Sequence, residues 1–486
     1  MQQLPVIPAR RTPKSASYLA ARLDGASESL QTSAAEAAEV DRGRRVYFEV
    51  FGCQMNKLDA ELMMSVLYED GYRLTNRMEE AGVVLYNTCA IREQAENRVF
   101  SKIGALVPKK RSNPDLVIGV LGCSAQNHRE AILKRYPHVG IVCGPGEFLR
   151  LPELISTART DGQVAALDLD VTPVYERRRN LGPTPFQAYV SVMRGCDQAC
   201  TFCVVPKTRG KEVSRPVREI IDEARALVDD GVREITLLGQ TVNSYGKRLA
   251  KGRKIGLHHV LYELHKIDGL ERISFITSHP KFMFPELIEA MGTLEKVSNY
   301  LHLPVQSGSD AVLQRMLRTY TAEHYRDVIA VCREANPDLG LATDIIVGFC
   351  GETDAEFEET LRLIEAMRYQ GSFVFRYSER SGTRAAERYT DDVPEDVKRE
   401  RNQRALQAVE RVALEEYRMR IGKVETVLVE GVSKLDPTRL TGRNHRRQIV
   451  VFPGDTTENL VGRLVPVRIT DATHVVLVGE KVGEGR

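Results

Sequence analysis

The chain has 486 residues, of which 42% are hydrophobic and 28% charged, so it is long enough to bury several cores and to form two or three domains. Its 68 basic and 66 acidic residues give a net charge of +2, which excludes a global attraction to polyanions and leaves only a local patch for nucleic acid. No apolar run reaches the ~20 residues of a membrane span and no secretory signal is evident, so we expect a cytoplasmic protein without a membrane partner.

Residues 1–43 form a tail rich in Ala, Ser, Pro and Arg, and this composition predicts disorder. The first acidic residue is Asp24, and such an acid-poor, Arg-bearing start also resembles an organelle transit peptide. Acidic residues return at Glu28, Glu36 and Glu39, which favours a plain tail over a targeting segment.

Residues 44–160 alternate short β-rich runs with amphipathic helical stretches, which predicts an α/β domain built on a doubly wound parallel sheet. Cys53, Cys89 and Cys123 each stand at the end of one of these runs, at 46–51, 83–87 and 116–121. Because the carboxyl ends of parallel strands share one edge, where such folds place ligands, the three thiols can converge although they are 36 and 34 residues apart.

A proline-rich, basic linker at 161–185, which includes Arg177, Arg178 and Arg179, suits an exposed domain junction. Beyond it, residues 186–418 contain six further β-rich runs at 188–193, 234–238, 273–277, 300–305, 341–348 and 372–377. Helical stretches separate these runs, and six strand-helix units predict an open, partial (β/α)6 barrel, since the complete barrel needs eight. Residues 420–482 then carry close-set strands without helices, which predicts a small all-β barrel.

Three cysteines follow the first run of the central domain in one tight loop: Cys196, Cys200 and Cys203, with the spacing C-x3-C-x2-C. Three thiolates leave one of the four irons of a cubane iron-sulfur cluster open, and reductive cleavage of S-adenosylmethionine requires that vacancy. Structural zinc is the alternative, but zinc takes four ligands, and no nearby His or Cys in the sequence completes the set.

This cysteine pattern resembles that of the radical S-adenosylmethionine superfamily, and further matches follow at strand ends in chain order. The cofactor-binding residues that the resemblance implies are Phe202, Gly239, Gln240, Ser278, Gln306, Asp344 and Val347, with Ser307, Gly308, Gly348 and Glu352 beside them. A glycine or serine at a strand end is also an ordinary turn residue, so the argument depends on their ordered recurrence.

The earlier cysteines, within FGCQMNKLDAE, NTCAIREQAENRVF and LGCSAQ, are similar to the methylthiotransferase family over roughly residues 45–480. QMN after Cys53 and VVPKTRGKEVSRP after Cys203 resemble the branch that acts on N6-isopentenyladenosine beside the tRNA anticodon, rather than the branch that acts on a ribosomal-protein aspartate. The resemblance implies two 4Fe-4S clusters and no catalytic residue beyond their ligands. The implied ligands are Cys53, Cys89 and Cys123 for an auxiliary cluster, and Cys196, Cys200 and Cys203 for the other.

Buried free thiols are the alternative for the first cysteine triad, because cysteine often ends apolar strands. Cys143, Cys332 and Cys350 lack such partners, and we expect them to be buried thiols. Cys350 also departs from the family, which commonly has proline at this position. Without the proline ring, the loop backbone is freer.

The family's reaction implies methylthiolation of adenine C2, whose unactivated hydrogen requires a cofactor to supply the reactive species. One S-adenosylmethionine methylates a cluster-bound sulfur, and a second provides 5′-deoxyadenosyl radical chemistry. The protein would hold two clusters and a base in a dry cavity. We therefore expect a transferase for tRNA that works as a monomer with a reductase or flavodoxin-type electron donor.

The last domain resembles the TRAM module, a small RNA-binding barrel. Its segment RLTGRNHRRQ is basic, and we expect Arg443, Arg446 and Arg447, flanked by Arg439 and His445, to contact phosphates without reading sequence. A solvated charged face is the alternative for these residues, as an ordinary linker is for Arg177 to Arg179.

The target base would be read in a pocket, since bases of a single-stranded loop can be splayed out. Arg376 and Arg380, near the end of the last central strand, are candidates to face it, and buried ion pairs would explain them equally. Two other functions stay open: a methylthiotransferase for another substrate, and a non-catalytic iron-sulfur sensor that binds RNA and releases no 5′-deoxyadenosine.

Overall fold

The computed structural model describes residues 41–90, 93–169, 184–247, 249, 255–454 and 459–483. Most of the expected tail and much of the expected linker, including Arg177, Arg178 and Arg179, lie outside the described residues. The chain divides into two compact units, residues 1–174 and 175–486. None of the helices that the structure describes combines the length and the apolar content needed to cross a bilayer.

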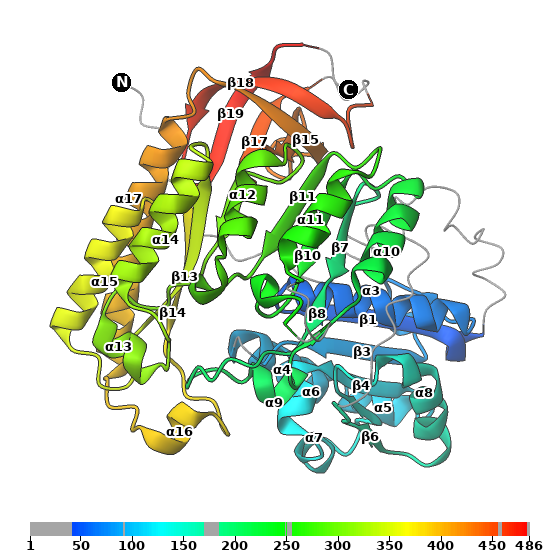
Figure 1. The fold of residues 1–486 in the computed structure, drawn as a ribbon. Helices are drawn as coiled ribbons and strands as arrows, with labels where there is room; N and C mark the ends of the chain where they lie inside the picture. The colour runs from blue at the N-terminus through cyan, green and yellow to red at the C-terminus, as the bar shows by residue number, and fades with distance from the viewer. Residues whose placement is uncertain are drawn as a thin grey trace. The chain divides into compact units, whose positions relative to one another are not determined.

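Unit 1 is built on a six-stranded sheet with the order β2-β1-β3-β4-β5-β6, and every pair in it is parallel (Figure 1). Its strands are β1 (Arg45–Phe51), β2 (Arg73–Leu74), β3 (Val83–Thr88), β4 (Val117–Gly122), β5 (Ile141–Cys143) and β6 (Val164–Ala166). Helices α3 (Gln54–Glu69) and α8 (Leu151–Thr160) pack together, and α4 (Glu93–Ala105) contributes Val99 and Ile103 to a separate core. The doubly wound parallel sheet expected from the sequence is thereby confirmed.

The central part of unit 2 contains two three-stranded parallel sheets, β11-β10-β7 and β12-β13-β14. Their strands are β7 (Gln187–Ser191), β10 (Glu234–Leu238), β11 (Arg272–Ile276), β12 (Tyr300–His302), β13 (Gly340–Val347) and β14 (Gly371–Arg376). The backbone of Ile273 links the two sheets, because its N–H donates to the carbonyl of Lys296 at 2.6 Å and its carbonyl accepts from the N–H of Ser298 at 2.8 Å. The six strands therefore form one open arc, as the sequence predicts.

Helices cover one face of this arc, and consecutive helices touch one another (Figure 1). They are α10 (Val217–Asp229), α11 (Leu257–His265), α12 (Pro285–Thr293), α14 (Ala322–Ala335), α15 (Asp354–Met367) and α17 (Glu395–Arg418). Because strand side chains alternate between faces, one face of the strands packs into the main core, where Val190, Ile235 and Ile345 are fully buried. The other face carries polar and aromatic side chains.

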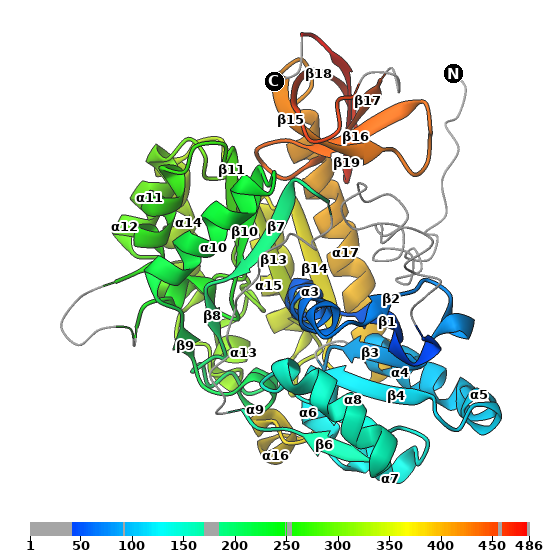
Figure 2. The same cartoon turned by 90° about the vertical axis from the view of Figure 1, so that its right-hand side faces the viewer.

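The chain ends in a closed barrel with the strand order β15-β16-β17-β19-β18, which follows α17 in unit 2 (Figure 2). Its strands are β15 (Val424–Val432), β16 (Arg439–Arg443), β17 (Ile449–Pro453), β18 (Leu464–Ala472) and β19 (Val476–Lys481). The small all-β barrel is confirmed, but β16 was not expected. Its sequence RLTGR has little β propensity, and pairing with β15 and β17 holds it in place.

The basic segment at the end of β16 and directly after it joins the barrel to the rest of unit 2 through its side chains. Arg447 Nη1 donates to Glu234 Oε1 at 3.2 Å and to Thr236 Oγ1 at 3.1 Å. The Arg446 side chain is 7% exposed and donates to Gln370 and Glu416. Arg443 in β16 pairs with Glu430 in the neighbouring β15, and burial lowers the pKa of His445 to about 4. These guanidinium groups are engaged within the protein, so Arg446 in particular does not present a free cation to phosphates.

We expect that replacing Glu234 with glutamine destabilises unit 2, because its carboxylate lies between the guanidinium groups of Arg272, at 3.8 Å, and Arg447. The side chains of Glu234 and Arg272 are each 2% exposed. Removing one partner of a buried ion pair costs about 3–5 kcal/mol of the free energy of unfolding. Urea unfolding followed by circular dichroism measures this loss. Glu263→Gln, which removes an exposed partner of Lys266, is the control and should cost less than ~1 kcal/mol. Equal losses in the two variants would contradict this interpretation.

The buried carboxylate of Glu234 also predicts that the unfolding free energy of unit 2 depends on pH. Burial raises the pKa of Glu234, but Arg272 and Arg447 outweigh burial, so the pKa lies below its ordinary value. A carboxylate with a depressed pKa stabilises the fold above the pKa of the unfolded chain, about 4.3, and this contribution is lost as the pH falls through the folded-state pKa. The difference in unfolding free energy between parent and Glu234→Gln should therefore shrink below pH ~4.

Candidate cluster and cofactor sites

The second cysteine triad lies in the loop between β8 (Met193–Arg194) and α9 (Val205–Arg209). The N–H of Cys196 donates to the carbonyl of Gly210 at 3.2 Å, and the N–H of Cys203 donates to that of Cys200 at 3.1 Å, which closes the loop. Burial, reinforced by Cys200, raises the pKa of Cys203 to about 12, and burial raises the pKa of Cys196. Both thiols therefore hold their protons in the absence of a cluster, and a bound cluster would have to displace those protons.

Two side chains that sequence reasoning missed contact these sulfurs. Thr241 Oγ1 lies 3.3 Å from Cys196 Sγ, and Arg318 Nη1 donates to Cys200 Sγ at 3.4 Å. The contacts join residues 45 and 118 positions apart, so no local pattern could indicate them.

Gly239, Gln240, Ser278 and Gln306 follow the carboxyl ends of strands in unit 2, whereas Asp344 and Val347 lie within β13 and Phe202 lies in the cysteine loop. The side-chain amide atoms of Gln240 and the hydroxyl of Ser278 are buried and make no hydrogen bond to any atom of the described residues. Buried polar groups are nearly always paired, so these atoms fit a polar ligand such as the methionine part of S-adenosylmethionine. At Gly239 a side chain would come within 2.6 Å of Met193, which leaves room only for glycine.

The other expected contacts differ in what they can offer a ligand. Gln306 has a φ of 75°, and its N–H donates to the carbonyl of Asp344 at 2.9 Å. The carboxylate of Asp344 lies 3.2 Å from His302 Nε2 on the face without helices. Val347 is fully buried on the helix side, so only its backbone can reach a cofactor, and Phe202 packs against a cluster that includes Phe349.

The first cysteine triad lies on one edge of the sheet in unit 1. Phe51 pairs with Thr88, and Thr88 pairs with Gly122, so the strands end side by side. Cys53 follows β1 by two residues, whereas Cys89 and Cys123 directly follow β3 and β4. The register therefore brings the three cysteines to adjacent strand ends, as the sequence predicts for a parallel sheet.

Glycine and asparagine pack this edge closely. Gly52 has a φ of 129°, and a Cβ there would lie 2.3 Å from the Cβ of Cys89. Asn87 Nδ2 donates to the Asn56 carbonyl at 2.7 Å, and Asn56 Oδ1 lies 3.3 Å from Cys53 Sγ. The asparagines thus tie the loop of Cys53 to the neighbouring strand.

No three His, Cys, Asp or Glu side chains within the described ranges converge on a site for a single metal ion. A cubane cluster makes a different demand, because each cysteine binds a separate iron. The remaining cysteines are buried: Cys143 in β5, Cys332 in α14 (Ala322–Ala335) and Cys350 beside Phe349.

An aromatic pair on the face without helices also escaped sequence reasoning. Phe373 is 56% exposed, and its ring lies 6.3 Å from that of Phe375 at an interplanar angle of 20°. The register pairs Phe373 with Asp344, so the rings and this carboxylate share a face. Two aromatics spaced by two in a predicted strand are the signal that could have indicated them. Nearby, Arg376 pairs with Glu395 but stays 40% exposed, and Arg380 is half-buried.

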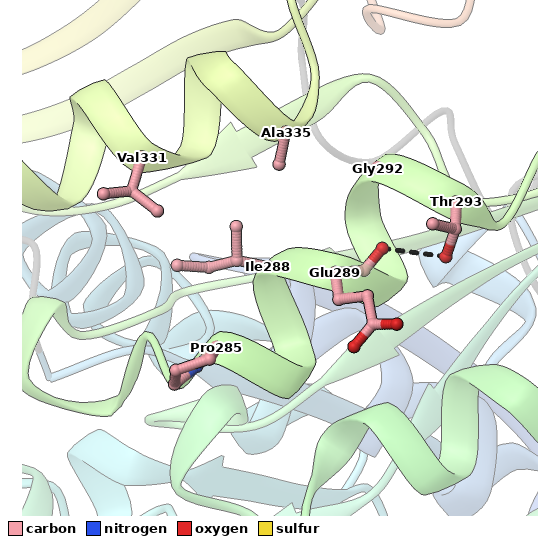
Figure 3. Close-up of a pocket in the computed structure, with 7 residues that line it drawn as sticks. All are labelled: Pro285, Ile288, Glu289, Gly292, Thr293, Val331 and Ala335. Atoms are coloured by element: carbon pink, nitrogen blue, oxygen red, sulfur yellow. Dashed lines mark hydrogen bonds between the residues drawn. The ribbon is translucent and has the colours of Figure 1, made fainter.

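A separate apolar groove lies between α12 and α14 on the helix side of unit 2 (Figure 3). Ile288 and Val331 line it from the two helices. None of the expected site residues lines this groove, so it is not part of the candidate cofactor site.

Comparisons with known proteins cover the same three segments. Family models match at residues 45–144 (uncharacterized protein family UPF0004), 190–364 (radical SAM superfamily) and 418–482 (TRAM domain). The tRNA-2-methylthio-N(6)-dimethylallyladenosine synthase of Rhodopirellula baltica is 43% identical over 460 residues, covering 90% of this chain and 95% of that protein. The protein of the same name from Bordetella avium is 44% identical over 444 residues, covering 90% and 92%.

Among solved structures, the radical S-adenosylmethionine methyltransferase TsrM from Kitasatospora setae, with cobalamin and a 4Fe-4S cluster bound, is similar with a TM-score of 0.51. The match has 13% sequence identity and covers 71% of this chain and 77% of that one. At this identity the likeness concerns the fold alone.

Proposed function

We propose, from the premise that this chain belongs to the family of tRNA-2-methylthio-N(6)-dimethylallyladenosine synthases, that it adds a methylthio group to C2 of N6-isopentenyladenosine next to the tRNA anticodon. It is a radical S-adenosylmethionine transferase whose cofactors are S-adenosylmethionine and 4Fe-4S clusters. The observation that carries the proposal is the pair of cysteine triads, one after the parallel strands of unit 1 and one in the loop between β8 and α9 of unit 2.

The two triads would hold one cluster each, so that each cluster keeps an iron without a protein ligand. When bound, the clusters and S-adenosylmethionine supply the sulfur, the methyl group and the radical that an unactivated C–H bond requires. Gln240 and Ser278 would orient S-adenosylmethionine through their unpaired buried atoms. The backbone at Gln306 and Val347 would line the same edge, with Gly239 allowing close approach.

The face of the sheet opposite the helices of unit 2 suits an unstacked base. Exposed aromatic rings hold splayed bases by stacking, which contributes about 1–3 kcal/mol per base. Phe373 and Phe375 provide such rings, and the exposed Arg376 lies next to them in the strand. We therefore assign the base contacts to this face.

Replacing Phe373 and Phe375 with alanine should raise the KM for tRNA about 5- to 150-fold, because stacking energy is lost. Cleavage of S-adenosylmethionine without tRNA should stay at the parent rate, because neither ring is among the residues expected to hold the cluster or S-adenosylmethionine. Phe284→Ala removes a ring that is 52% exposed before α12, and it is the matched control. An unchanged KM in the double variant would show that the base binds elsewhere.

The function is tested with anaerobically reconstituted protein, reductant, S-adenosylmethionine and tRNA that carries isopentenyladenosine but no methylthio group. Mass analysis of the nucleosides should show the methylthio derivative. Formation of 5′-deoxyadenosine with unmodified tRNA would favour another substrate. Absence of both products would favour the non-catalytic sensor.

We also propose that the protein acts in the cytoplasm as a monomer and takes electrons from a reductase or flavodoxin-type donor. Reduction of a low-potential cluster needs an external electron, which supports such a donor. Sedimentation of the reconstituted protein with and without tRNA checks the monomeric state.

A further inference from the structure

A segment that no motif marked braces the cluster loop of unit 2. Thr201 donates through its N–H to the carbonyl of Met316 and through its hydroxyl to that of Arg315, both at 3.0 Å. Arg318 Nη1 donates to the sulfur of Cys200 at 3.4 Å. Three bonds thus tie the middle of the loop to the residues that end α13 (Asp310–Arg315) and follow it.

The guanidinium of Arg318 is fixed from its other side. Its Nη2 donates to the carbonyl of Pro304 at 2.8 Å, and its Nε donates to the hydroxyl of Tyr320 at 2.8 Å. Tyr320 in turn donates to the carbonyl of Val305 at 2.8 Å. Since these carbonyls directly precede Gln306, the guanidinium connects the cluster loop with the strand end expected to contact S-adenosylmethionine. Its direction toward the sulfur is therefore set by the fold.

Cys196 has its own donors. Thr241 is 4% exposed, and its hydroxyl lies 3.3 Å from the sulfur, while the N–H of Gln198 donates to the same atom at 3.4 Å. A sulfur bound to iron has no proton to donate, so the hydroxyl of Thr241 must be the donor when a cluster is present.

Hydrogen bonds and positive charge near cluster sulfurs stabilise the reduced cluster, because it carries one more negative charge than the oxidised one. We propose that Thr241 and Arg318 are positioning residues that raise the reduction potential of the cluster on Cys196, Cys200 and Cys203. They thereby ease its one-electron reduction by a flavodoxin-type donor. The inference rests on the proposed function only in requiring a reducible cluster on these cysteines.

The test measures the midpoint potential by electron paramagnetic resonance during a reductive titration with dithionite. Protein with Cys53, Cys89 and Cys123 replaced by alanine is reconstituted anaerobically, so that a single cluster gives the signal. Thr241→Val and Arg318→Gln should both shift the midpoint to more negative values, and Arg318→Gln should shift it more because a full charge is lost. Iron content per chain should stay at the parent level.

Two control variants lose similar groups without touching a sulfur. Thr208→Val removes a buried hydroxyl that donates to the carbonyl of Val204 at 3.2 Å, and Arg315→Gln removes a guanidinium that pairs with Glu356 at 2.9 Å. Both should keep the parent midpoint.

Parent midpoints in Thr241→Val and Arg318→Gln would overturn the inference. If Arg318→Gln lost its cluster, Thr241→Val would decide, because valine has nearly the shape of threonine. A parent protein that bound no cluster or released no 5′-deoxyadenosine would instead refute the proposed function. The two failures are therefore distinguishable.

Discussion

Replacing Cys196 with alanine is expected to halve the iron content, from about eight to about four atoms per chain, and to reduce cleavage of S-adenosylmethionine below detection. Cys200 and Cys203 alone offer two thiolates, which leaves two of the four irons of a cubane cluster without a protein ligand. Without that cluster no electron reaches the sulfonium group. Iron and sulfide analysis, with chromatography of 5′-deoxyadenosine, measures both effects.

Cys332→Ala is the matched control for this variant. Its thiol is 1% exposed in α14 and lies in the hydrophobic core, so its loss should leave both clusters and cleavage in place. Full iron content in Cys196→Ala, or zinc in place of iron in the parent, would contradict the assignment of this triad.

Replacing Cys89 with alanine is expected to stop methylthiolation of adenosine while cleavage of S-adenosylmethionine continues. The iron content should again fall to about four atoms per chain, but 5′-deoxyadenosine should still form, because the loop in unit 2 is intact. Methylthiolated adenosine should fall below detection, because the auxiliary cluster would no longer be present to supply sulfur. Mass analysis of tRNA nucleosides measures the product, and 5′-deoxyadenosine in the same sample measures cleavage.

Cys143→Ala controls for the loss of a buried thiol from the same sheet, since Cys143 lies in β5 and is fully buried. It should keep both clusters and the product. If Cys89→Ala also stopped formation of 5′-deoxyadenosine, or kept all its iron, the independent role of the first triad would be wrong.

Features that depend on neighbouring residues were accessible from the sequence. The alternation of strands and helices in both units and the all-β barrel were expected and are confirmed, because periodic burial is a local pattern. The alignment of Cys53, Cys89 and Cys123 on one sheet edge also followed, since parallel strands end together. Strands without apolar alternation were missed: β16 forms because two neighbours pair with it, and β5 and β6 have only three residues each.

Contacts between distant residues were decided by the tertiary structure. The charge of Arg447 was evident in the sequence, but its carboxylate partner Glu234 is 213 positions away, so no local pattern could show that this segment also joins the barrel to the sheet. Arg318 likewise donates to Cys200 across 118 positions, so this contact also depends on the packing of distant elements. The sequence by itself determined which residue types could bind clusters and in which order they occur, because spacing and alternation are local. Only the folded chain decided which polar groups are already paired and which remain for a ligand, because burial and pairing depend on packing between elements far apart in the chain.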